Sequence, residues 1–344
     1  MRKLVVAAVI LVVLGAAALV VSRTAIWGRL HDPFKGYTAE EQFVIIAPGT
    51  GTAAIGRRLV ETGVIRDQLA FRAALWWTGR ARDLQAGEYR FDRAMAAVDV
   101  VERLARGDVY TRRLTFPEGL MIREMAEIFE TRGFGSGASF VEAASNVSLI
   151  KDLDADARDL EGYLFPETYA LPRETPAARV IAMMVDRFRA TYPDDWRRRA
   201  ADQDLTTRQV VTLASLVEKE TGQAQERPMV AAVYRNRLKI GMPLQADPTV
   251  VYAMQKAGTY NGNIRRDDLA LDSPYNTYRY PGLPPGPIAS PGAAALEAVL
   301  KPAAVSYLYF VSRNDGSHVF ADSLAEHNRN VREFQVLYFR RSSR

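Results

Sequence analysis

The sequence predicts an α+β protein with a single N-terminal transmembrane helix, a small α/β module and a larger mixed α+β domain. Three observations support this prediction. An unbroken run of about 18 apolar residues fills positions 4–21. A compact stretch of about 65 residues then alternates short strand patterns with helical ones. Beyond it, amphipathic helical runs are mixed with short strands, and 48% of the 344 residues are hydrophobic, which supports a real core.

The apolar run at residues 4–21 predicts an uncleaved signal anchor. A helix of about 18 residues is roughly 27 Å long, close to the hydrocarbon thickness of a bilayer. Arg2 and Lys3 precede the run, so the positive-inside rule predicts a cytoplasmic tip at residues 1–3 and exports the rest. A cleaved signal peptide is the alternative. However, the run exceeds a usual h-region, and no small-residue cleavage site precedes Arg23.

Residues 22–40 are predicted to be a short polar linker, because Pro33 and Gly36 interrupt any periodic pattern. The small module follows at residues 41–108. Its helices are predicted from apolar spacing and from glycines at their ends, and its strands from β-branched or alternating residues. We expect a strand at 43–46, helices at 52–63 and 67–77, a strand at 84–91 and a helix at 96–107.

The larger domain is predicted to cover residues 109–344. Residues 258–292 contain no long periodic element and are rich in Tyr, Asn, Pro and Gly. A loop of that length in a compact domain is usually functional or disordered, and its aromatic residues argue against disorder. The expected elements are a strand at 110–116, helices ending near 132, at 176–192 and from 207, two helices around 241–248, a strand at 307–313 and a terminal helix.

Composition excludes several classes of function. The chain has no cysteine, so it has no disulfide framework, cysteine nucleophile or thiolate metal site. The net charge of +5 is compatible with anionic partners. No basic run is interleaved with aromatic residues, so nucleic acid is not an expected partner. His31, His318 and His327 are far apart, and none has metal-ligand spacing, so no metal site is predicted.

The helix predicted to begin at Thr207 carries carboxylates at its far end. Thr206 and Gln209 have the spacing of a capping box. At 100° per residue the apolar side chains form one face, and Glu218 and Glu220 flank that face on opposite sides. A carboxyl at the edge of a buried face is partly desolvated, which favours its protonated form and suits it to acid catalysis.

The same helix also allows a plain structural interpretation. Gly222 is expected to end it as a left-handed C′ residue, and Lys219 and Glu226 are consistent with a solvated helix end. Two carboxyls two residues apart diverge on a helix, so they cannot form the facing pair of an ordinary glycosidase. Periodicity therefore does not choose between Glu218 and Glu220 or exclude a surface role for both.

Several longer motifs resemble one bacterial family. In chain order they are "FPEGL", "LEGYLFPETY", "LASLVEKETG", "VAAVYRNRL", "GMPLQADPTVVYA", "SPYNTYRYPGLPPGPIASPG" and "YLYFVSR" followed by "GSHVFADSLAEHN". They are similar to those of the endolytic murein transglycosylases, the MltG or YceG-like family. The resemblance covers nearly the whole chain beyond the predicted anchor. It implies that residues 41–108 are a LysM-like module and residues 109–344 a transglycosylase catalytic domain.

The resemblance also implies a reaction. Members of the family cleave glycan strands of nascent peptidoglycan close to the inner membrane, between N-acetylmuramic acid and N-acetylglucosamine, leaving 1,6-anhydro-muramic ends. The family's catalytic glutamate is the first of the "VEKET" motif, which is Glu218 here. No cofactor is implied. Peptidoglycan synthases are expected partners, and the enzyme is expected to be single-pass in the inner membrane with its catalytic domain on the periplasmic side.

Under this interpretation, residues 272–292 are expected to line the substrate groove. Tyr275, Tyr278 and Tyr280 offer flat faces for sugar rings, although core packing explains such tyrosines equally well. The expected hydrogen-bonding residues toward sugar hydroxyl and acetamido groups are Gln245, Asp247 and Asn276, with Glu220 as a neighbour that orients the site. Turn formation before Pro248 is the alternative explanation for Asp247.

Two further functions stay open from the sequence. A muramidase would hydrolyse the same bond with water, using Glu218 as the acid and Asp247 as the base for water. A non-catalytic glycan-binding scaffold would bind strands without cleaving them. The products and the effect of Glu218→Gln distinguish these three functions.

Overall fold

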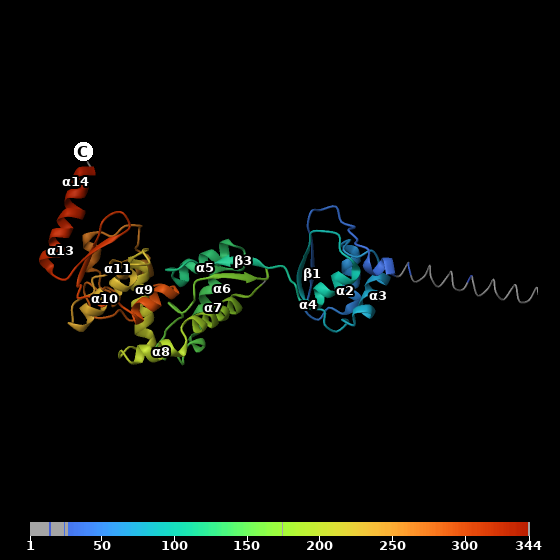
Figure 1. Ribbon diagram of the computed structural model, residues 1–344, viewed down its shortest axis with the longest axis horizontal. Coiled ribbons are helices and arrows are strands. Elements are labelled where there is room, and N and C mark those ends of the chain that lie inside the picture. Colours follow the sequence, from blue (N-terminus) through green and yellow to red (C-terminus); the bar gives the residue numbers. More distant parts are fainter. Residues whose placement is uncertain (1–13, 15–23, 25–26, 174, 343–344) are drawn as a thin grey trace, which may run out of the picture. The chain divides into compact units, whose positions relative to one another are not determined.

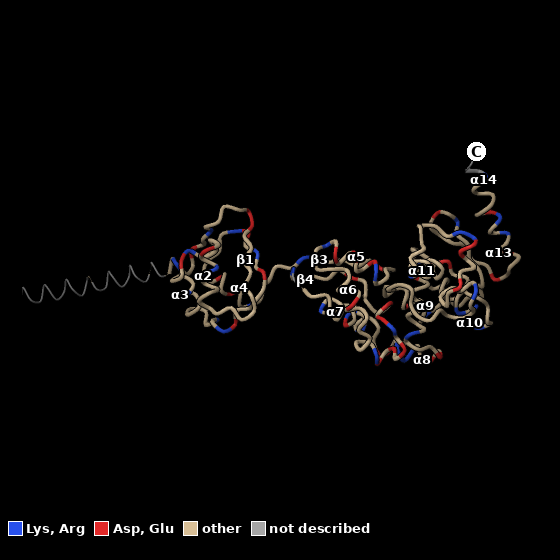
Figure 2. Tube along the Cα trace, turned by 180° about the vertical axis from the view of Figure 1, so that it is seen from behind, with Lys and Arg blue, Asp and Glu red and all other residues tan. Residues whose placement is uncertain are grey.

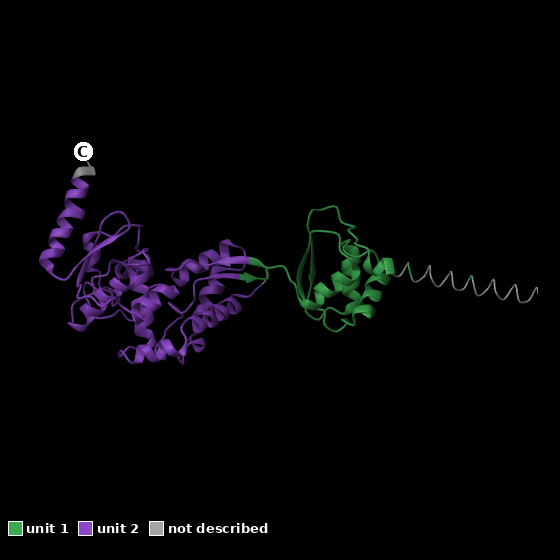
Figure 3. Cartoon of the chain, in the orientation of Figure 1, with its two compact units in different colours: residues 1–112, 170–173 green, residues 113–169, 174–344 purple. Residues whose placement is uncertain are grey.

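The structure is a computed structural model that describes residue 14, residue 24 and residues 27–173 and 175–342. The chain divides into two compact units (Figures 1 and 3). Unit 1 contains residues up to 112 together with residues 170–173, and unit 2 contains residues 113–169 and 174–344. Acidic and basic residues are interspersed along both units (Figure 2). The mixed α+β class predicted from the sequence is confirmed.

The predicted anchor at residues 4–21 lies outside the described residues except for Leu14. No helix among the residues that the structure describes is long and apolar enough to cross a membrane.

Unit 1 is built on an antiparallel pair of strands. Phe43 pairs with Arg90 and Val44 with Tyr89. Three helices pack with this pair around one apolar core, in which Leu59, Phe91 and Leu104 have no exposed surface. The LysM-like assignment of this unit stays a prediction. The elements are β1 (Gln42–Ile46), α2 (Thr52–Glu61), α3 (Gln68–Thr78), β2 (Gly87–Phe91) and α4 (Ala97–Arg106).

Part of the predicted linker packs on this unit. Residues 27–31 are helical, and Leu30 is buried in the core of unit 1. Phe34 and Met95 exchange two backbone hydrogen bonds of 3.0 and 3.2 Å. The polar composition of residues 22–40 does not reveal these contacts, because single apolar residues make them.

Unit 2 is mainly helical and contains short strands. β3 (Arg112–Thr115) pairs with β4 (Thr168–Leu171), and β5 (Tyr309–Ser312) pairs antiparallel with β6 (His318–Ala321). The helices are α5 (Ile122–Thr131), α6 (Gly137–Ala144), α7 (Ala177–Thr191), α8 (Asp194–Ala201), α9 (Thr207–Glu220), α10 (Arg227–Lys239), α11 (Asp247–Ala257), α12 (Ala293–Leu300), α13 (Leu324–Val331) and α14 (Tyr338–Ser342). The 3-10 turns are η1 (Val147–Leu149) and η2 (Arg266–Ala270), and η3 (Arg332–Leu337) is π-helical.

Helix α9 is the centre of the C-terminal part of unit 2. It packs against α8, α10, α11 and α12, and every residue from Val210 to Val217 is buried. The loop at residues 132–136 joins α5 to α6. Residues 258–292 contain only the short turn η2, so the expected long loop is also confirmed.

Candidate active site

The predicted capping box fixes the start of α9. The Gln209 N–H donates to Thr206 Oγ1 at 3.2 Å, and the Thr206 N–H donates to Gln209 Oε1 at 2.9 Å. These bonds satisfy two of the free N–H groups at the helix start. With its register set here and its middle turns buried on all sides, α9 delivers Glu218 and Glu220 to a fixed position at its C-terminal end.

The helix does not end as predicted. Gly222 was expected in a left-handed conformation, but this glycine is not among those with positive φ, and the C-cap Thr221 is extended at φ −137° and ψ 132°. The Thr221 hydroxyl donates to Glu226 Oε2 at 3.1 Å. Glu226 also accepts hydrogen bonds from His318. The end of α9 is therefore held by Glu226, five residues along the chain from Thr221, and Glu226 is held in turn by the distant His318.

Glu218 is held by two donors. Its Oε1 lies 3.0 Å from Nη2 of Arg227, and its Oε2 accepts the Gly292 N–H at 3.0 Å. The Glu218 side chain is only 5% exposed and that of Arg227 12%. A charge-assisted pair in such a shielded place is stronger than a surface pair, so the Glu218 carboxyl has one defined orientation.

Two loop segments cross the end of α9 beside Glu218. The Gly119 N–H donates to Ser290 O at 2.9 Å, and the Ser290 N–H donates to Leu120 O at 2.8 Å. Lys219 Nζ donates to Gly119 O at 3.1 Å and so ties the first segment to α9. The "FPEGL" and "ASPG" motifs therefore meet at Glu218, although about 170 residues separate them.

A second carboxylate, Glu118, lies at the same place. Its Oε2 is 3.6 Å from the same Arg227 Nη2 that contacts Glu218, and its side chain is 47% exposed. Burial raises the pKa of the Glu118 carboxyl, and the charge of Glu218 adds to the rise, whereas Arg227 lowers it. Helical periodicity does not indicate Glu118, and its place in the "FPEGL" motif is the signal in the sequence that points to it.

Glu220 lies in a different environment. Burial raises its pKa to about 7, with Asp247 adding to the rise and Tyr234 and Arg237 opposing it. Its Oε2 and the Tyr234 hydroxyl are both buried, and neither makes a hydrogen bond within the part of the chain that the structure describes. Tyr234 thus lies close enough to Glu220 to lower the pKa of the Glu220 carboxyl, although the two groups do not meet the geometry of a hydrogen bond.

Asp247 and Tyr278 belong to the environment of Glu220. The Tyr278 hydroxyl donates to Asp247 Oδ1 at 2.5 Å, and the charge of Glu220 contributes to raising the pKa of Tyr278, after burial and this hydrogen bond. Gln245 is exposed and has φ 50°, so the loop before α11 turns sharply at this residue. The structure therefore brings Glu220, Asp247 and Tyr278 together, with Gln245 close by in sequence.

The remaining expected contacts differ in their accessibility. Asn276 is fully buried. Its amide donates to Leu269 O and Leu271 O, and its Oδ1 accepts the Tyr278 N–H. Because these bonds occupy its polar atoms, Asn276 shapes the loop and does not present a free group to a sugar. Tyr280 is 42% exposed, and Tyr275 packs on Tyr252 with ring centroids 4.8 Å apart.

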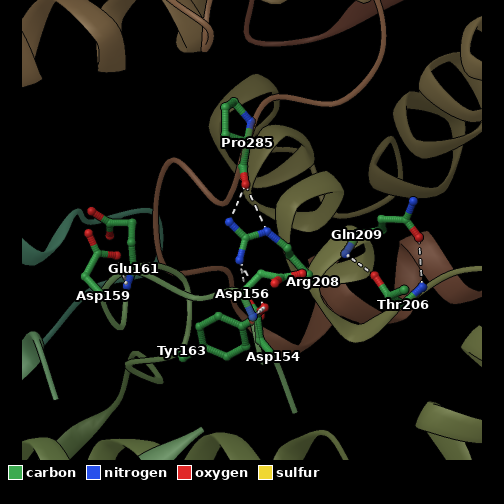
Figure 4. A network of polar contacts seen from close by, with 9 residues as sticks. All are labelled: Asp154, Asp156, Asp159, Glu161, Tyr163, Thr206, Arg208, Gln209 and Pro285. Carbon is green, nitrogen blue, oxygen red and sulfur yellow. Dashed lines mark hydrogen bonds and ion pairs between the residues drawn. The ribbon is translucent and has the colours of Figure 1, made fainter. Parts of the chain in front are cut away.

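An arginine fixes the other end of this loop. Figure 4 shows Arg208, in the first turn of α9, between Asp154 and Pro285. Its Nη1 lies 2.9 and 3.0 Å from the two Asp154 oxygens, and its Nε donates to Pro285 O at 2.9 Å. Tyr163 donates to the same carboxylate at 2.8 Å. The first turn of α9 thus contacts the loop 272–292 at Pro285. The last turn of α9 contacts the same loop through Glu218 and the Gly292 N–H.

A cavity of about 430 Å³ opens beside the start of α5. Glu161 lines it, and its carboxylate accepts the Ile122 N–H at 3.1 Å. Burial raises the pKa of Glu161 to about 8, and Asp159 adds to the rise. Lys256 on α11 also lines the cavity, and its Nζ lies 5.6 Å from the ring centroid of Tyr252 and 5.5 Å from that of Tyr275.

The YceG-like family matches residues 44–333, and the chain belongs to this family. The resemblance that the motifs predicted is therefore confirmed.

Particular relatives agree with this assignment. An endolytic murein transglycosylase of Bacillus subtilis is 31% identical over 90% of this chain and 90% of its own length. A protein of that name from Streptococcus pneumoniae is 31% identical over 84% of this chain, which spans 57% of the pneumococcal protein. A crystal structure of a YceG-like protein from Listeria monocytogenes is 30% identical, with a TM-score of 0.58, covering 84% of this chain and 98% of that one.

Proposed function

We propose that this protein is a membrane-anchored endolytic transglycosylase that cleaves nascent peptidoglycan strands, with Glu218 as the general acid and base. The observation that carries the proposal is the constellation at the end of α9. There a shielded glutamate contacts Arg227 and the Gly292 N–H, and a second carboxylate lies beside it. The names of the relatives that the chain matches over most of its length supply the substrate.

In the first step Glu218 would donate a proton to the glycosidic oxygen of the bond after N-acetylmuramic acid. Both contacts that Glu218 makes in the free protein are to donors, which suits its ionised form. Glu118, which lies beside Glu218 on the same Arg227, is the neighbouring carboxyl through which Glu218 would receive its proton.

In the second step the ionised Glu218 would take the proton from the C6 hydroxyl of the same sugar as that oxygen attacks C1. The new C1–O6 bond replaces the glycosidic bond and gives a 1,6-anhydro end. Because the attacking group belongs to the substrate, no protein nucleophile is required, and effective molarities of roughly 10⁵ M or more are available to well-oriented intramolecular reactions. The Gly292 N–H and Arg227 hold the carboxylate in place for this step.

The groove beside Glu218 would be formed by the loop 272–292. Tyr278 and Asp247, joined by a hydrogen bond, and the exposed Gln245 and Tyr280 are the candidates for contacts with sugar rings and acetamido groups. Glu220 would support this wall through Asp247 and Tyr278 without touching the scissile bond. Its raised pKa would follow from that enclosed position.

The membrane anchor at residues 4–21 and a periplasmic catalytic domain are part of the proposal. They rest on the apolar run and on the basic residues before it. Peptidoglycan synthases are proposed partners, because a strand that is cut near the membrane is still being made.

One observation favours a second candidate, a hydrolytic muramidase. The Glu118 and Glu218 oxygens that contact Arg227 Nη2 at 3.6 and 3.0 Å are at most about 6.6 Å apart, which reaches only the lower edge of the roughly 6.5–9.5 Å spacing of carboxyl pairs that activate water. In this case Glu118 would activate water. Asp247 suits that role less well, because the Tyr278 hydroxyl already occupies it.

Product mass decides between these functions. Purified glycan strands would be treated with the full-length protein, its Glu218→Gln variant and its Glu220→Gln variant, and the ends analysed by mass spectrometry. We expect ends one water lighter than hydrolytic ends from the wild type and from Glu220→Gln, and none from Glu218→Gln. Full-mass reducing ends would support the muramidase, and strand binding without cleavage by the wild type would support a scaffold.

A further inference from the structure

Three of the four tryptophans in the chain lie on the surface of unit 1. Trp27, Trp76 and Trp77 are 53%, 82% and 52% exposed. Tryptophan is highly buried on average in soluble proteins. Such exposure at three neighbouring residues therefore indicates a contact surface, since single exposed apolar residues are ordinary but clusters of them mark interaction sites.

The rings of Trp27, His31 and Trp77 form a preformed cluster, and Trp76 is the next residue to it on α3. Trp27 packs on His31 with ring centroids 4.1 Å apart, and Trp27 meets Trp77 edge-on at 5.6 Å. His31 lies 6.0 Å from Trp77. The cluster therefore joins the helical residues 27–31 to helix α3. Its rings already pack on one another, so binding does not have to order them.

Helix α3 is apolar on two faces, which is unusual for a helix of a small soluble unit. One face buries Ala70, Phe71, Ala74 and Leu75 in the core. The opposite face, at helical spacing, carries Leu69, which is 55% exposed, and Trp76, with Arg72 between them. Neighbouring exposed apolar residues mark an interaction surface, so this second face is a candidate contact surface of unit 1.

The position of the cluster along the chain identifies what this surface contacts. Trp27 follows the proposed anchor, which ends at residue 21, by six positions. Six residues span at most about 20 Å even when fully extended. The cluster is therefore tethered within reach of the bilayer surface.

We propose that the aromatic face, formed by Trp27, Leu69, Trp76 and Trp77, inserts into the headgroup region of the membrane that holds the anchor. Tryptophan is enriched at this depth because its ring is apolar and its N–H is polar. Arg72 on the same side of α3 suits lipid phosphates. The face fixes which side of unit 1 lies against the bilayer. This inference rests on the anchor in the proposed function.

Lipid quenching of tryptophan emission tests this proposal. The full-length chain would be reconstituted in nanodiscs with or without lipids brominated near the headgroup. Two single-tryptophan versions would be compared, one keeping Trp76 and one keeping Trp196 of α8 in unit 2, with the other tryptophans changed to Phe. Circular dichroism melts would verify that both versions fold. We expect brominated lipid to remove most of the Trp76 emission and little of the Trp196 emission.

The outcomes separate this inference from the anchor itself. A chain that stays with the nanodisc while Trp76 is quenched no more than Trp196 would overturn the aromatic face and leave the anchor intact. A chain that does not stay with the nanodisc would overturn both. Emission of Trp76 that responds to added glycan strands and not to brominated lipid would assign the face to sugar binding and also overturn the proposal.

Discussion

The substitution Gly292→Ala tests whether Glu118 acts with Glu218. The Gly292 N–H holds Glu218, and a Cβ at this position would lie 1.8 Å from Glu118 Oε1 and 2.2 Å from its Cδ. Alanine keeps the N–H, and φ −77° with ψ 172° is open to it. The substitution should therefore move the Glu118 carboxyl and leave the backbone contact to Glu218 in place.

The size of the effect follows from that distance. A non-bonded contact needs about 3.5 Å, so the Glu118 carboxyl must move by at least about 1.5 Å. Misplacement of a reacting group by about 1 Å can cost on the order of 10²-fold in rate. We expect Gly292→Ala to lower the rate of strand cleavage by roughly this factor. The melting temperature should stay close to that of the wild type, because the flexible Glu118 side chain can move aside.

The assay is the initial rate of strand cleavage by the full-length protein. Gly222→Ala is the matched control, because a Cβ there meets no atom within 4 Å, and it should leave the rate unchanged. Glu118→Gln should lower the rate about as much as Gly292→Ala, and the double variant should lose no more than Glu118→Gln alone. Full activity of Gly292→Ala, or losses that multiply in the double variant, would refute the role of Glu118.

Three other predictions follow from the buried groups. Burial raises the pKa of Glu161 to about 8, from an ordinary value of 4.5. The folded state therefore binds a proton that the unfolded state releases, and the free energy of unfolding should fall by up to about 1.4 kcal/mol per pH unit as the pH rises between those values. Glu161→Gln should remove this dependence of the unfolding free energy on pH, measured by denaturant titration at several pH values. The neighbouring charged groups Asp159, Glu124 and Lys256 stay in place in this variant. An unchanged dependence would show that Glu161 does not cause it. Gly162→Ala should destabilise unit 2 by roughly 2–5 kcal/mol, because φ is +83° and a Cβ would meet Pro287 at 2.5 Å. Gly258→Ala has a similar φ of +71° with open space and should cost only the backbone part, about 1–2 kcal/mol; equal losses would exclude the Pro287 contact. Glu220→Gln should give the same product as the wild type. It should change the dependence of the cleavage rate on pH near pH 7, because Glu220 has a pKa of about 7 and Gln does not ionise. An unchanged dependence would show that Glu220 is not coupled to the site.

The sequence predicted the parts of the fold that local patterns determine. The capping box at Thr206 and Gln209 starts α9 as expected, and Gly107 ends α4 in the left-handed conformation at φ 69°. These features depend on residues within one or two turns of each other. Local propensity and hydrogen bonding decide such features before any tertiary contact forms.

Elements without a clear period were not predicted. Helix α8 has few apolar residues, and α12 is short and apolar almost all round, so neither shows a helical stripe. Strand β4 lies in the aromatic segment before α7, and β6 precedes the terminal helix, in sequences too short for alternation to be visible. Packing against neighbours, which the sequence does not display, determines these four elements.

The candidate site was predicted only in part for the same reason. Glu218 and Glu220 were placed at the edges of a buried helix face, and the structure separates their environments as helix geometry requires. Glu118 and Gly292 reach the site through contacts across about 100 and 74 residues of chain. Periodicity does not report such contacts, and the role expected for Gly222 failed because Glu226 determines the end of α9.

Cleavage in water labelled with heavy oxygen tests the central claim most directly. Glycan strands would be digested by the full-length protein and by its Glu118→Gln and Glu218→Gln variants, and the new ends analysed by mass spectrometry. We predict that the wild type gives anhydro ends that contain no label, and that Glu118→Gln gives the same ends more slowly. For Glu218→Gln we predict a cleavage rate lower by at least about 10²-fold, so that no ends are detected. Labelled reducing ends, or undiminished cleavage by Glu218→Gln, would contradict the account.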